Sequence, residues 1–303
     1  MTLSFRLFKI WEFVATRAPV IFGHKFYKKY IGTIKGNIAT FYLGKKFVPK
    51  ISKLSPEIST RESPETIWQF WDKGVDKAPE VVRACWRTVE KHKENKKQII
   101  LDMQTLPNYT DLPGIIYDRL RKNEMSMQSF SDVIRINLLK NQGGYWMDST
   151  DYMTAPIPKF IEMQPFFIFH DRIITPKTFI QSCFIRSEKK HFLAVAHNDL
   201  MIKYWTIEDT QIDYFTFHLM FRALIKYNKY AHKLYLKMPY IDQESIHRVS
   251  GGSHKVSKKL ITKFDADKYA NLIKDNFFQK LTFKGIPEDL PSDSFLAQMI
   301  KMA

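Results

Sequence analysis

The chain contains little glycine, almost no cysteine and no long apolar run. Among its 303 residues are 11 Gly and two Cys, Cys85 and Cys183. Two cysteines cannot build the disulfide framework of a small secreted domain, so we expect both to be buried free thiols in a reducing compartment. No stretch reaches the roughly 18 to 20 apolar residues of a transmembrane helix, and no signal-peptide pattern is present. These absences predict a cytoplasmic protein, and the length suits one large α/β domain with an appendage.

Acidic residues are scarce as well, and the shortage is local. The chain has 31 Asp and Glu against 47 Lys and Arg, a net charge of +16. Residues 1–53 carry eleven Lys or Arg and one acid, Glu12, which is an excess of ten positive charges. A concentrated excess indicates a particular binding surface rather than a general effect on solubility. We therefore predict that residues 1–60 form a basic helical appendage to a domain over residues 61–303.

The first helix of this appendage is predicted to have an apolar face. Leu3, Leu7, Ile10, Trp11 and Val14 fall within about 100° of one another on a helical wheel. Charged side chains occupy the other side, although two phenylalanines fall among them. This composition is typical of an interfacial helix on an anionic membrane surface, which would place the protein on the inner face of the plasma membrane. The alternatives are packing on the main domain and the interface of a homo-oligomer.

A nucleic-acid partner is not expected. Aromatic residues do lie among the lysines of residues 26–42, as in proteins that bind single strands. However, no helix-turn-helix, KH or RNP pattern accompanies them.

Beyond the appendage, predicted strands and helices alternate, which favours a mainly parallel sheet flanked by helices. The predicted strands are 66–71, 98–102, 145–147, 165–170 and 178–186. The predicted helices are 79–92, 114–122, the segment before residue 143, 190–205 and 211–228. Residues 229–303 read as basic and irregular, with a flexible loop at 250–255.

The most informative stretch is SDVIRINLLKNQGGYWMDSTD, residues 131–151. Apolar residues recur at intervals of three and four, which predicts a helix whose start Ser129 or Ser131 could cap. Gly143 stands where a left-handed residue ends such a helix, and Gly144 lets the chain turn into a buried strand. This order brings polar residues of the helix and of the strand end into one α/β unit.

Two groups of polar residues in this stretch suit a ligand. Asp132 and Arg135 share one face of the helix, and an arginine fork beside a carboxylate is suited to sugar hydroxyls or phosphate oxygens. The alternative is a solvated ion pair. Asp148, which opens the run Asp-Ser-Thr-Asp, directly follows the strand, and carboxylates there could hold a divalent cation and a diphosphate. The alternative for this run is an ordinary turn.

The string FSDVIRINLLKNQGGYWMDSTDYMTAPIP resembles the core of the capsular polysaccharide synthesis family, bacterial glycosyltransferases related to the group with a DXD-type sugar-binding region. The flanking segments IWQFWDKGVDKAPEVVRACWRTVEKH, IDYFTFHLMF and FFQKLTFK are also similar to the family, so the resemblance covers about residues 64–284. It implies a GT-A-like domain over residues 61–303. It also implies retaining transfer of galactose or glucose from a UDP-hexose donor, giving an α-linkage, to a lipid-diphosphate-linked saccharide acceptor in capsule or surface polysaccharide synthesis.

The resemblance also implies roles for individual residues. Catalytic roles fall on Asp132, Arg135 and Asp213. Contacts to the donor and its nucleotide fall on Trp68, Gln69, Phe70, Ser131, Asp132, Arg135, Asp148, Ser149, Lys280 and Lys284. For the aromatic strand residues, core packing is the alternative. No protein nucleophile is assigned, because retaining enzymes can react on one face of the sugar without one.

A divalent cation, Mn²⁺ or Mg²⁺, is the expected cofactor. Its expected ligands are Asp148, Thr150, Asp151 and His218, with a buried hydrogen-bonded histidine as the alternative for His218. Thr150 stands where the wider DXD group has its second acid, and a hydroxyl is a poorer ligand for a hard cation. Asp151 could substitute, Asp148 could act with waters and the diphosphate, or metal use could be weak. The same departure leaves open a degenerate, non-catalytic member that binds nucleotide or lipid and scaffolds an assembly complex.

Overall fold

The computed structural model describes residues 2–17, 24–50, 65–171, 179–251 and 255–303. The polar stretch that contains Pro56 and Pro64, and the centre of the predicted 250–255 loop, lie outside these residues. The helices are α1 (Leu3–Arg17), α2 (His24–Lys46), α3 (Glu80–His92), α4 (Gly114–Arg121), α5 (Met127–Gln142), α6 (Lys159–Glu162), α7 (Phe192–Ile207), α8 (Thr216–Tyr227), α9 (Lys229–Lys237), α10 (Lys258–Ile261), α11 (Ala266–Ile273) and α12 (Phe295–Met302).

A five-stranded sheet in the order β2-β1-β3-β6-β5 forms the centre of the molecule. Its strands are β1 (Thr66–Phe70), β2 (Lys97–Leu101), β3 (Gly144–Met147), β5 (Phe166–His170) and β6 (Ile180–Ser187). Strand β1 is parallel to β2 and β3, whereas β6 is antiparallel to both β3 and β5. Four strands therefore run in one direction and β6 in the other. The predicted mainly parallel α/β sheet flanked by helices is confirmed.

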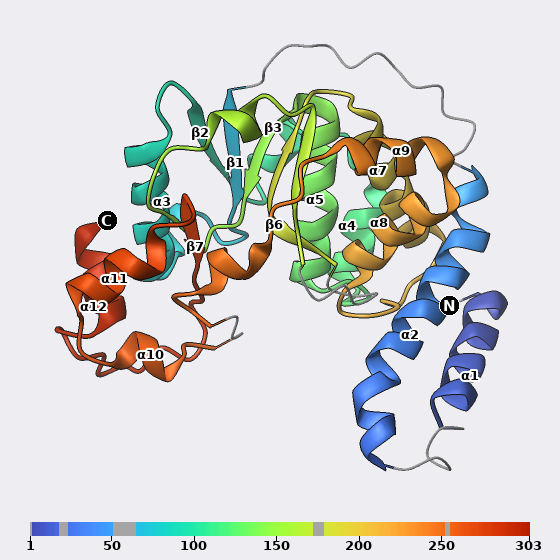
Figure 1. Ribbon diagram of the computed structural model, residues 1–303. Helices are drawn as coiled ribbons and strands as arrows, with labels where there is room; N and C mark the ends of the chain where they lie inside the picture. Colours follow the sequence, from blue (N-terminus) through green and yellow to red (C-terminus); the bar gives the residue numbers. More distant parts are fainter. Residues whose placement is uncertain (1, 18–23, 51–64, 172–178, 252–254) are drawn as a thin grey trace.

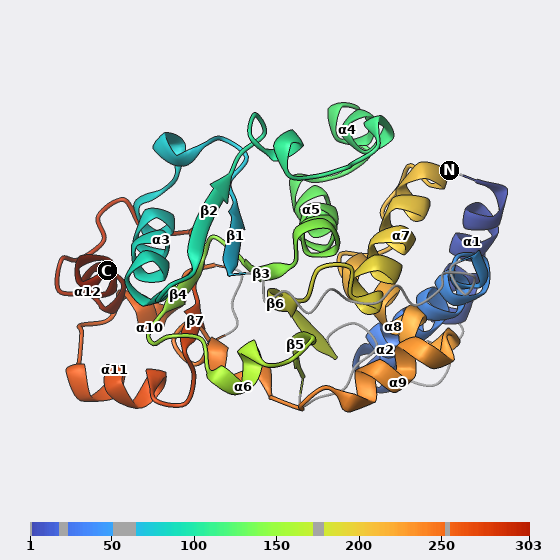
Figure 2. The same ribbon diagram turned by 90° about the horizontal axis from the view of Figure 1, so that it is seen from above.

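Helices cover both faces of this sheet (Figure 2). Helix α3 lies on one face, and α5 lies on the other, with α7 and α8 packed beyond it. Successive side chains of a strand point to opposite faces, so β1 sends Trp68 into the core on the α5 side and Ile67 into the core on the other side. Cys85 of α3 and Cys183 of β6 are buried free thiols, as predicted.

A second sheet pairs two short strands that are far apart in the sequence, β4 (Asp151–Met153) and β7 (Phe278–Lys280). They are antiparallel, and Asp151 lies opposite Lys280. The prediction that residues 229–303 are irregular is wrong, because this region also contains α9 to α12. These elements are short. Helix α9 packs on α8 and α7, and α12 packs on α3 and α10, so tertiary packing rather than a long periodic pattern stabilises them.

The turn from α5 into β3 depends on glycine. Gly143 and Gly144 have φ values of 69° and 96°. A Cβ on Gly144 would lie 2.4 Å from the carbonyl oxygen of Thr66, so no other residue fits there. At its other end α5 begins earlier than predicted. Ser126, rather than Ser129 or Ser131, caps the helix, and its hydroxyl accepts a hydrogen bond from the Ser129 amide at 3.1 Å.

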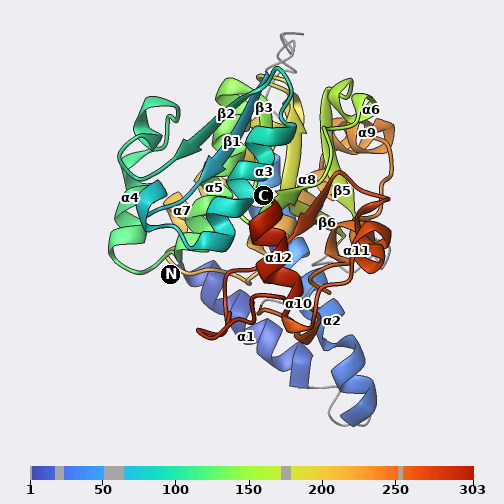
Figure 3. The same ribbon diagram turned by 90° about the vertical axis from the view of Figure 1, so that its left-hand side faces the viewer.

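At the N-terminus, α1 packs against α2, and α2 packs against α8 (Figure 1). Both helices extend past the edge of the central sheet at which β1 ends, as Figures 1 and 3 show from two directions. Among the residues that the structure describes, no helix is long and apolar enough to cross a membrane.

Candidate active site

Two adjoining cavities lie where β1 and β3 end. The first has a volume of about 470 Å³ and the second about 420 Å³. Arg135, Asp148 and Thr150 line both, so the cavities meet at these side chains. In open α/β sheets this carboxyl edge is the usual place for a ligand, and both volumes fall within the range of ligand pockets.

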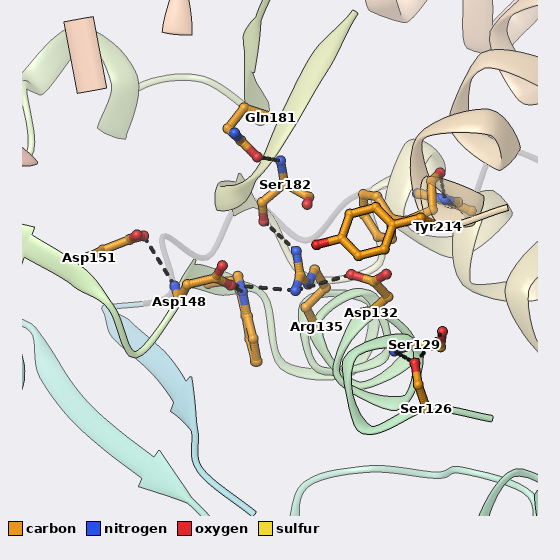
Figure 4. Close-up of polar contacts among 12 residues, drawn as sticks. Ser126, Ser129, Asp132, Arg135, Asp148, Asp151, Gln181, Ser182 and Tyr214 are labelled. Carbon is orange, nitrogen blue, oxygen red and sulfur yellow. Dashed lines mark hydrogen bonds and ion pairs between the residues drawn. The ribbon is translucent and has the colours of Figure 1, made fainter. Parts of the chain in front are cut away.

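Arg135 connects three elements beneath the first cavity (Figure 4). From α5, its Nη2 lies 3.1 Å from Oδ1 of Asp132 and 3.4 Å from Oδ1 of Asp148, and its Nη1 donates to the Ser182 carbonyl of β6 at 2.8 Å. The ring of Trp146 lies 5.3 Å from the guanidinium carbon. Arg135 is 5% exposed and Asp132 6%, so the alternative of a solvated ion pair is wrong.

The two carboxylates beside Arg135 differ in their electrostatics. Burial raises the pKa of Asp132 to about 6, against the opposing effect of Arg135. Burial acts in the same direction on Asp148, but Lys280 and Arg135 outweigh it and hold the pKa of Asp148 below its ordinary value. Asp148 therefore stays ionised at lower pH than Asp132 does. Its Oδ1 accepts a hydrogen bond from the Trp146 indole at 2.8 Å, which fixes its orientation.

Lys280 lies between two carboxylates. Its Nζ is 2.7 Å from Oδ2 of Asp148 and 3.2 Å from Oδ1 of Asp151. The antiparallel pairing of β4 with β7, which sets Asp151 opposite Lys280, creates this arrangement. Asp151 has no exposed surface, and burial raises its pKa to about 8, although Lys280 opposes the shift. Asp151 also accepts a hydrogen bond from the Asp148 amide through Oδ2, so it braces the turn rather than lining a cavity.

Asp148, Asp151 and His218 do not come together as a cluster that could hold a cation by protein side chains alone, and the divalent cation stays a prediction. No group of three His, Cys, Asp or Glu side chains suited to a metal occurs among the described residues. The ammonium of Lys280 lies between Asp148 and Asp151, where a cation shared by these carboxylates would have to be. His218 lines the first cavity. Burial lowers its pKa to about 3, which keeps the imidazole neutral, and its Nδ1 has no hydrogen-bond partner among the described residues.

Most of the residues predicted to contact a ligand or a cation line a cavity, but four of them do not. Those that line one or both cavities are Phe70, Ser131, Asp132, Arg135, Asp148, Ser149, Thr150, His218, Lys280 and Lys284. Asp151 lies outside both cavities. Trp68 donates its indole N–H to the Gly143 carbonyl at 2.8 Å, and Gln69 bonds to Gln98, so core packing describes both. Asp213 precedes α8, and its carboxylate accepts from the Phe215 amide at 3.0 Å.

Several cavity residues were not predicted. Phe283 lines both cavities, and its ring packs edge-on against Trp71 with centroids 5.1 Å apart. Gln181, Gln243 and His247 bring polar groups to the first cavity. The only local signal was the KLTFK string, which contains Phe283 between the predicted lysines. The other residues come from β6 and a short 3-10 turn, Gln243–His247, and no local pattern marks them.

Tyr214 also lines the first cavity, on the side opposite Asp148. Figure 4 shows its side chain reaching over Asp132 and Arg135. The side chain is about half exposed, so it forms part of the cavity mouth. Together, the buried and paired charged side chains line the bottom of the first cavity, and polar and aromatic side chains line its mouth.

Comparisons with known proteins give two findings and one negative result. Residues 20–299 match the family model described as capsular polysaccharide synthesis protein. Among solved structures, the chain is similar to the PaToxG glycosyltransferase, with 12% sequence identity, 76% of this chain and 85% of that chain covered, and a TM-score of 0.39. No curated protein matches. The family match spans nearly the whole chain and includes both cavities. The chain therefore belongs to the capsular polysaccharide synthesis family.

Proposed function

We propose that this protein is a retaining glycosyltransferase that moves galactose or glucose from a UDP-sugar to a lipid-linked saccharide in bacterial capsule or surface polysaccharide synthesis. Membership of the family supports a glycosyltransferase role. The observation that carries the proposal is the buried Arg135, paired with Asp132 and Asp148 at the junction of two cavities. A dry guanidinium flanked by carboxylates offers both donors and acceptors to a sugar phosphate.

The nucleotide occupies the second cavity in this proposal. Phe70, Trp71 and Phe283 supply aromatic surface for the uracil ring, and the Trp71 indole N–H has no partner among the described residues. Ser131 and Asp148 line the same cavity and are suited to ribose hydroxyls. The diphosphate then lies at the junction and the hexose in the first cavity, which matches the elongated shape of a UDP-sugar.

The departing UDP carries charge that cationic side chains stabilise. Lys280 and Lys284 line the first cavity, and Lys284 also lines the second. Preorganised positive groups in a site sheltered from water stabilise developing negative charge strongly. We assign to Lys280 the charge compensation that a divalent cation would otherwise supply, because its ammonium already lies between Asp148 and Asp151. The mechanism therefore includes no step at a metal.

Transfer then takes place on one face of the sugar. The bond between the anomeric carbon and the phosphate oxygen breaks, and the acceptor hydroxyl oxygen forms a new bond on the same face. The proton of that hydroxyl passes to the leaving phosphate oxygen, so no protein nucleophile is needed. Asp132 and Arg135 orient the sugar hydroxyls, and the residues of the cavity mouth, Tyr214, Gln243 and His247, contact the acceptor.

Turnover of a panel of UDP-sugars, followed as UDP release, tests this function. We expect hydrolysis of UDP-galactose or UDP-glucose, and at least a hundredfold slower turnover in Asp148→Asn. Asp118→Asn is the matched control, because Asp118 lies on α4 outside both cavities and its side chain is 43% exposed. No turnover of any UDP-sugar combined with tight UDP binding would instead indicate a degenerate nucleotide-binding scaffold.

A further inference from the structure

Helix α1 has one face packed on the protein and one face exposed. Phe5 and Phe8 are buried, and their rings pack against Tyr42 of α2. The exposed face carries large apolar side chains that are 51 to 73% exposed: Leu3, Leu7, Ile10, Trp11 and Val14. These are the five residues of the predicted apolar arc, so α1 packs through Phe5 and Phe8 and leaves the arc uncovered.

Helix α1 is fixed to the rest of the protein by a buried carboxylate. Glu208, which follows α7, has no exposed surface. Its oxygens accept hydrogen bonds from Thr2 Oγ1 at 2.6 Å, Tyr42 at 3.0 Å and Lys46 at 2.5 Å. The apolar arc is therefore held in one orientation relative to the active site.

Cationic groups border this apolar face. The guanidinium of Arg17 lies 4.0 Å from the ring centre of the exposed Phe13, and Lys45 lies 5.9 Å from that of the exposed Phe41. Arg6 is exposed beside the arc. Large apolar side chains beside Arg and Lys match a lipid surface whose headgroups are anionic and whose interior is apolar.

The direction in which α1 and α2 extend relates this face to the active site. Figures 1 and 3 show α1 and the start of α2 extending beyond the sheet at the edge where β1 ends. Asp148, which follows β3 at that edge, lines both cavities, and Phe70, at the end of β1, lines the second. The helix that carries the exposed face therefore extends on the side of the molecule at which the strands deliver the ligand site.

We propose that the exposed face of α1 docks on an anionic lipid bilayer and holds the active site at its surface. This inference rests on the proposed function only for the purpose of docking, which is access to an acceptor carried by a lipid. The docking itself depends on the helix face and its charges. A second copy of the chain could cover the same apolar face, and the experiment separates the two.

Flotation of the full-length protein with vesicles tests the docking. We expect binding to vesicles of phosphatidylcholine with about one-third phosphatidylglycerol, weaker binding to phosphatidylcholine alone, and weakening by salt. The double variant Leu7→Glu/Trp11→Glu should bind at least tenfold more weakly. The control Met163→Glu/Leu236→Glu makes the same kind of change at two exposed apolar residues distant in sequence and should bind like the unaltered protein.

Two results would overturn the proposal. One is equal flotation of the α1 variant and the control. The other is a dimer of the unaltered protein, found by sedimentation, that the α1 variant abolishes, because the arc would then be an interface between copies. UDP-sugar hydrolysis in detergent-free solution serves as the separate readout of function. A protein that floats but never turns over a UDP-sugar retains the docking and loses the proposed function.

Discussion

At the scale of single residues, the active site is built from charges that satisfy one another before any ligand arrives. Arg135 and Lys280 each contact two carboxylates, and Asp148 is shared between them. Buried charges are tolerated only when they are paired, so these residues hold their positions without a ligand. Such an arrangement suits the sugar diphosphate of the proposed donor.

Lys280 provides a test of charge compensation at this scale. We expect the UDP affinity of the unaltered protein, measured by calorimetry, to change less than about twofold between EDTA and Mn²⁺. Lys280→Ala should bind UDP at least tenfold more weakly, a loss of about 1.4 kcal/mol or more. Lys274→Ala, at an exposed lysine of the same region, is the control. Loss of UDP binding by the unaltered protein in EDTA would show that a cation, rather than Lys280, supplies the charge.

Asp132 predicts a pH dependence of stability. Its pKa in the folded protein is about 6, above its ordinary value of 3.8, because burial favours the neutral carboxyl. The unfolded chain therefore loses this proton at lower pH than the folded protein does. The stability that neutral Asp132 contributes is fully present below about pH 4 and is lost as the pH rises to about 6.

The variant Asp132→Asn removes this titration. Relative to the variant, the unaltered protein should lose roughly 2 to 3 kcal/mol of unfolding free energy between pH 4 and pH 6, and little more above that. Urea unfolding at several pH values measures the difference, with Asp118→Asn on α4, outside both cavities, as the control. A difference between the two proteins that is independent of pH would contradict the assigned burial of Asp132.

At the scale of elements, the α5–β3 unit was predictable because its information is local. The spacing of apolar residues marked the helix, the Gly143–Gly144 pair marked the turn, and Asp148 followed the strand. The residues expected to contact the nucleotide base were less predictable from the sequence. Alternation along β1 cannot say which face meets a cavity, so Trp68 and Gln69 were assigned to a ligand although both are buried in the core. The pairing of β4 with β7, which brings Lys280 to Asp148, had no local signal at all.

The contacts that attach α1 and α2 to the rest of the protein can be tested through their contribution to stability. Lys46→Met removes the cation beside the fully buried Glu208 and leaves that carboxylate without charge compensation. Removing one partner of a buried pair is costly, so we expect a loss of about 2 to 4 kcal/mol in unfolding free energy. Lys45→Met, at the neighbouring exposed lysine, should cost little.

Adding Glu208→Gln to Lys46→Met should restore part of the lost stability, because the uncompensated charge is then removed. Urea unfolding of the four proteins measures these differences. Equal stability of the Lys46 and Lys45 variants would contradict the role of this pair in holding α1 and α2.

At the scale of the whole molecule, two adjoining cavities lie at the carboxyl edge of the sheet, and α1 and α2 extend past the same edge. The sequence already indicated the basic excess of the appendage and the five residues of the apolar arc. It could not indicate that Phe5 and Phe8 face inward, because only the contacts with Tyr42 decide which side of α1 is packed. Distances between elements far apart in the chain are similarly invisible to a local pattern.

The proposed reaction is the transfer of a hexose from a UDP-sugar with retention. Proton NMR of the full-length protein with UDP-galactose and with UDP-glucose, in EDTA, tests it most directly. We expect that one of these donors is hydrolysed and that the first sugar released is the α-anomer, before mutarotation. Release of the β-anomer would contradict retention. No release from any UDP-hexose, while the protein still binds UDP, would contradict the assignment of a glycosyltransferase.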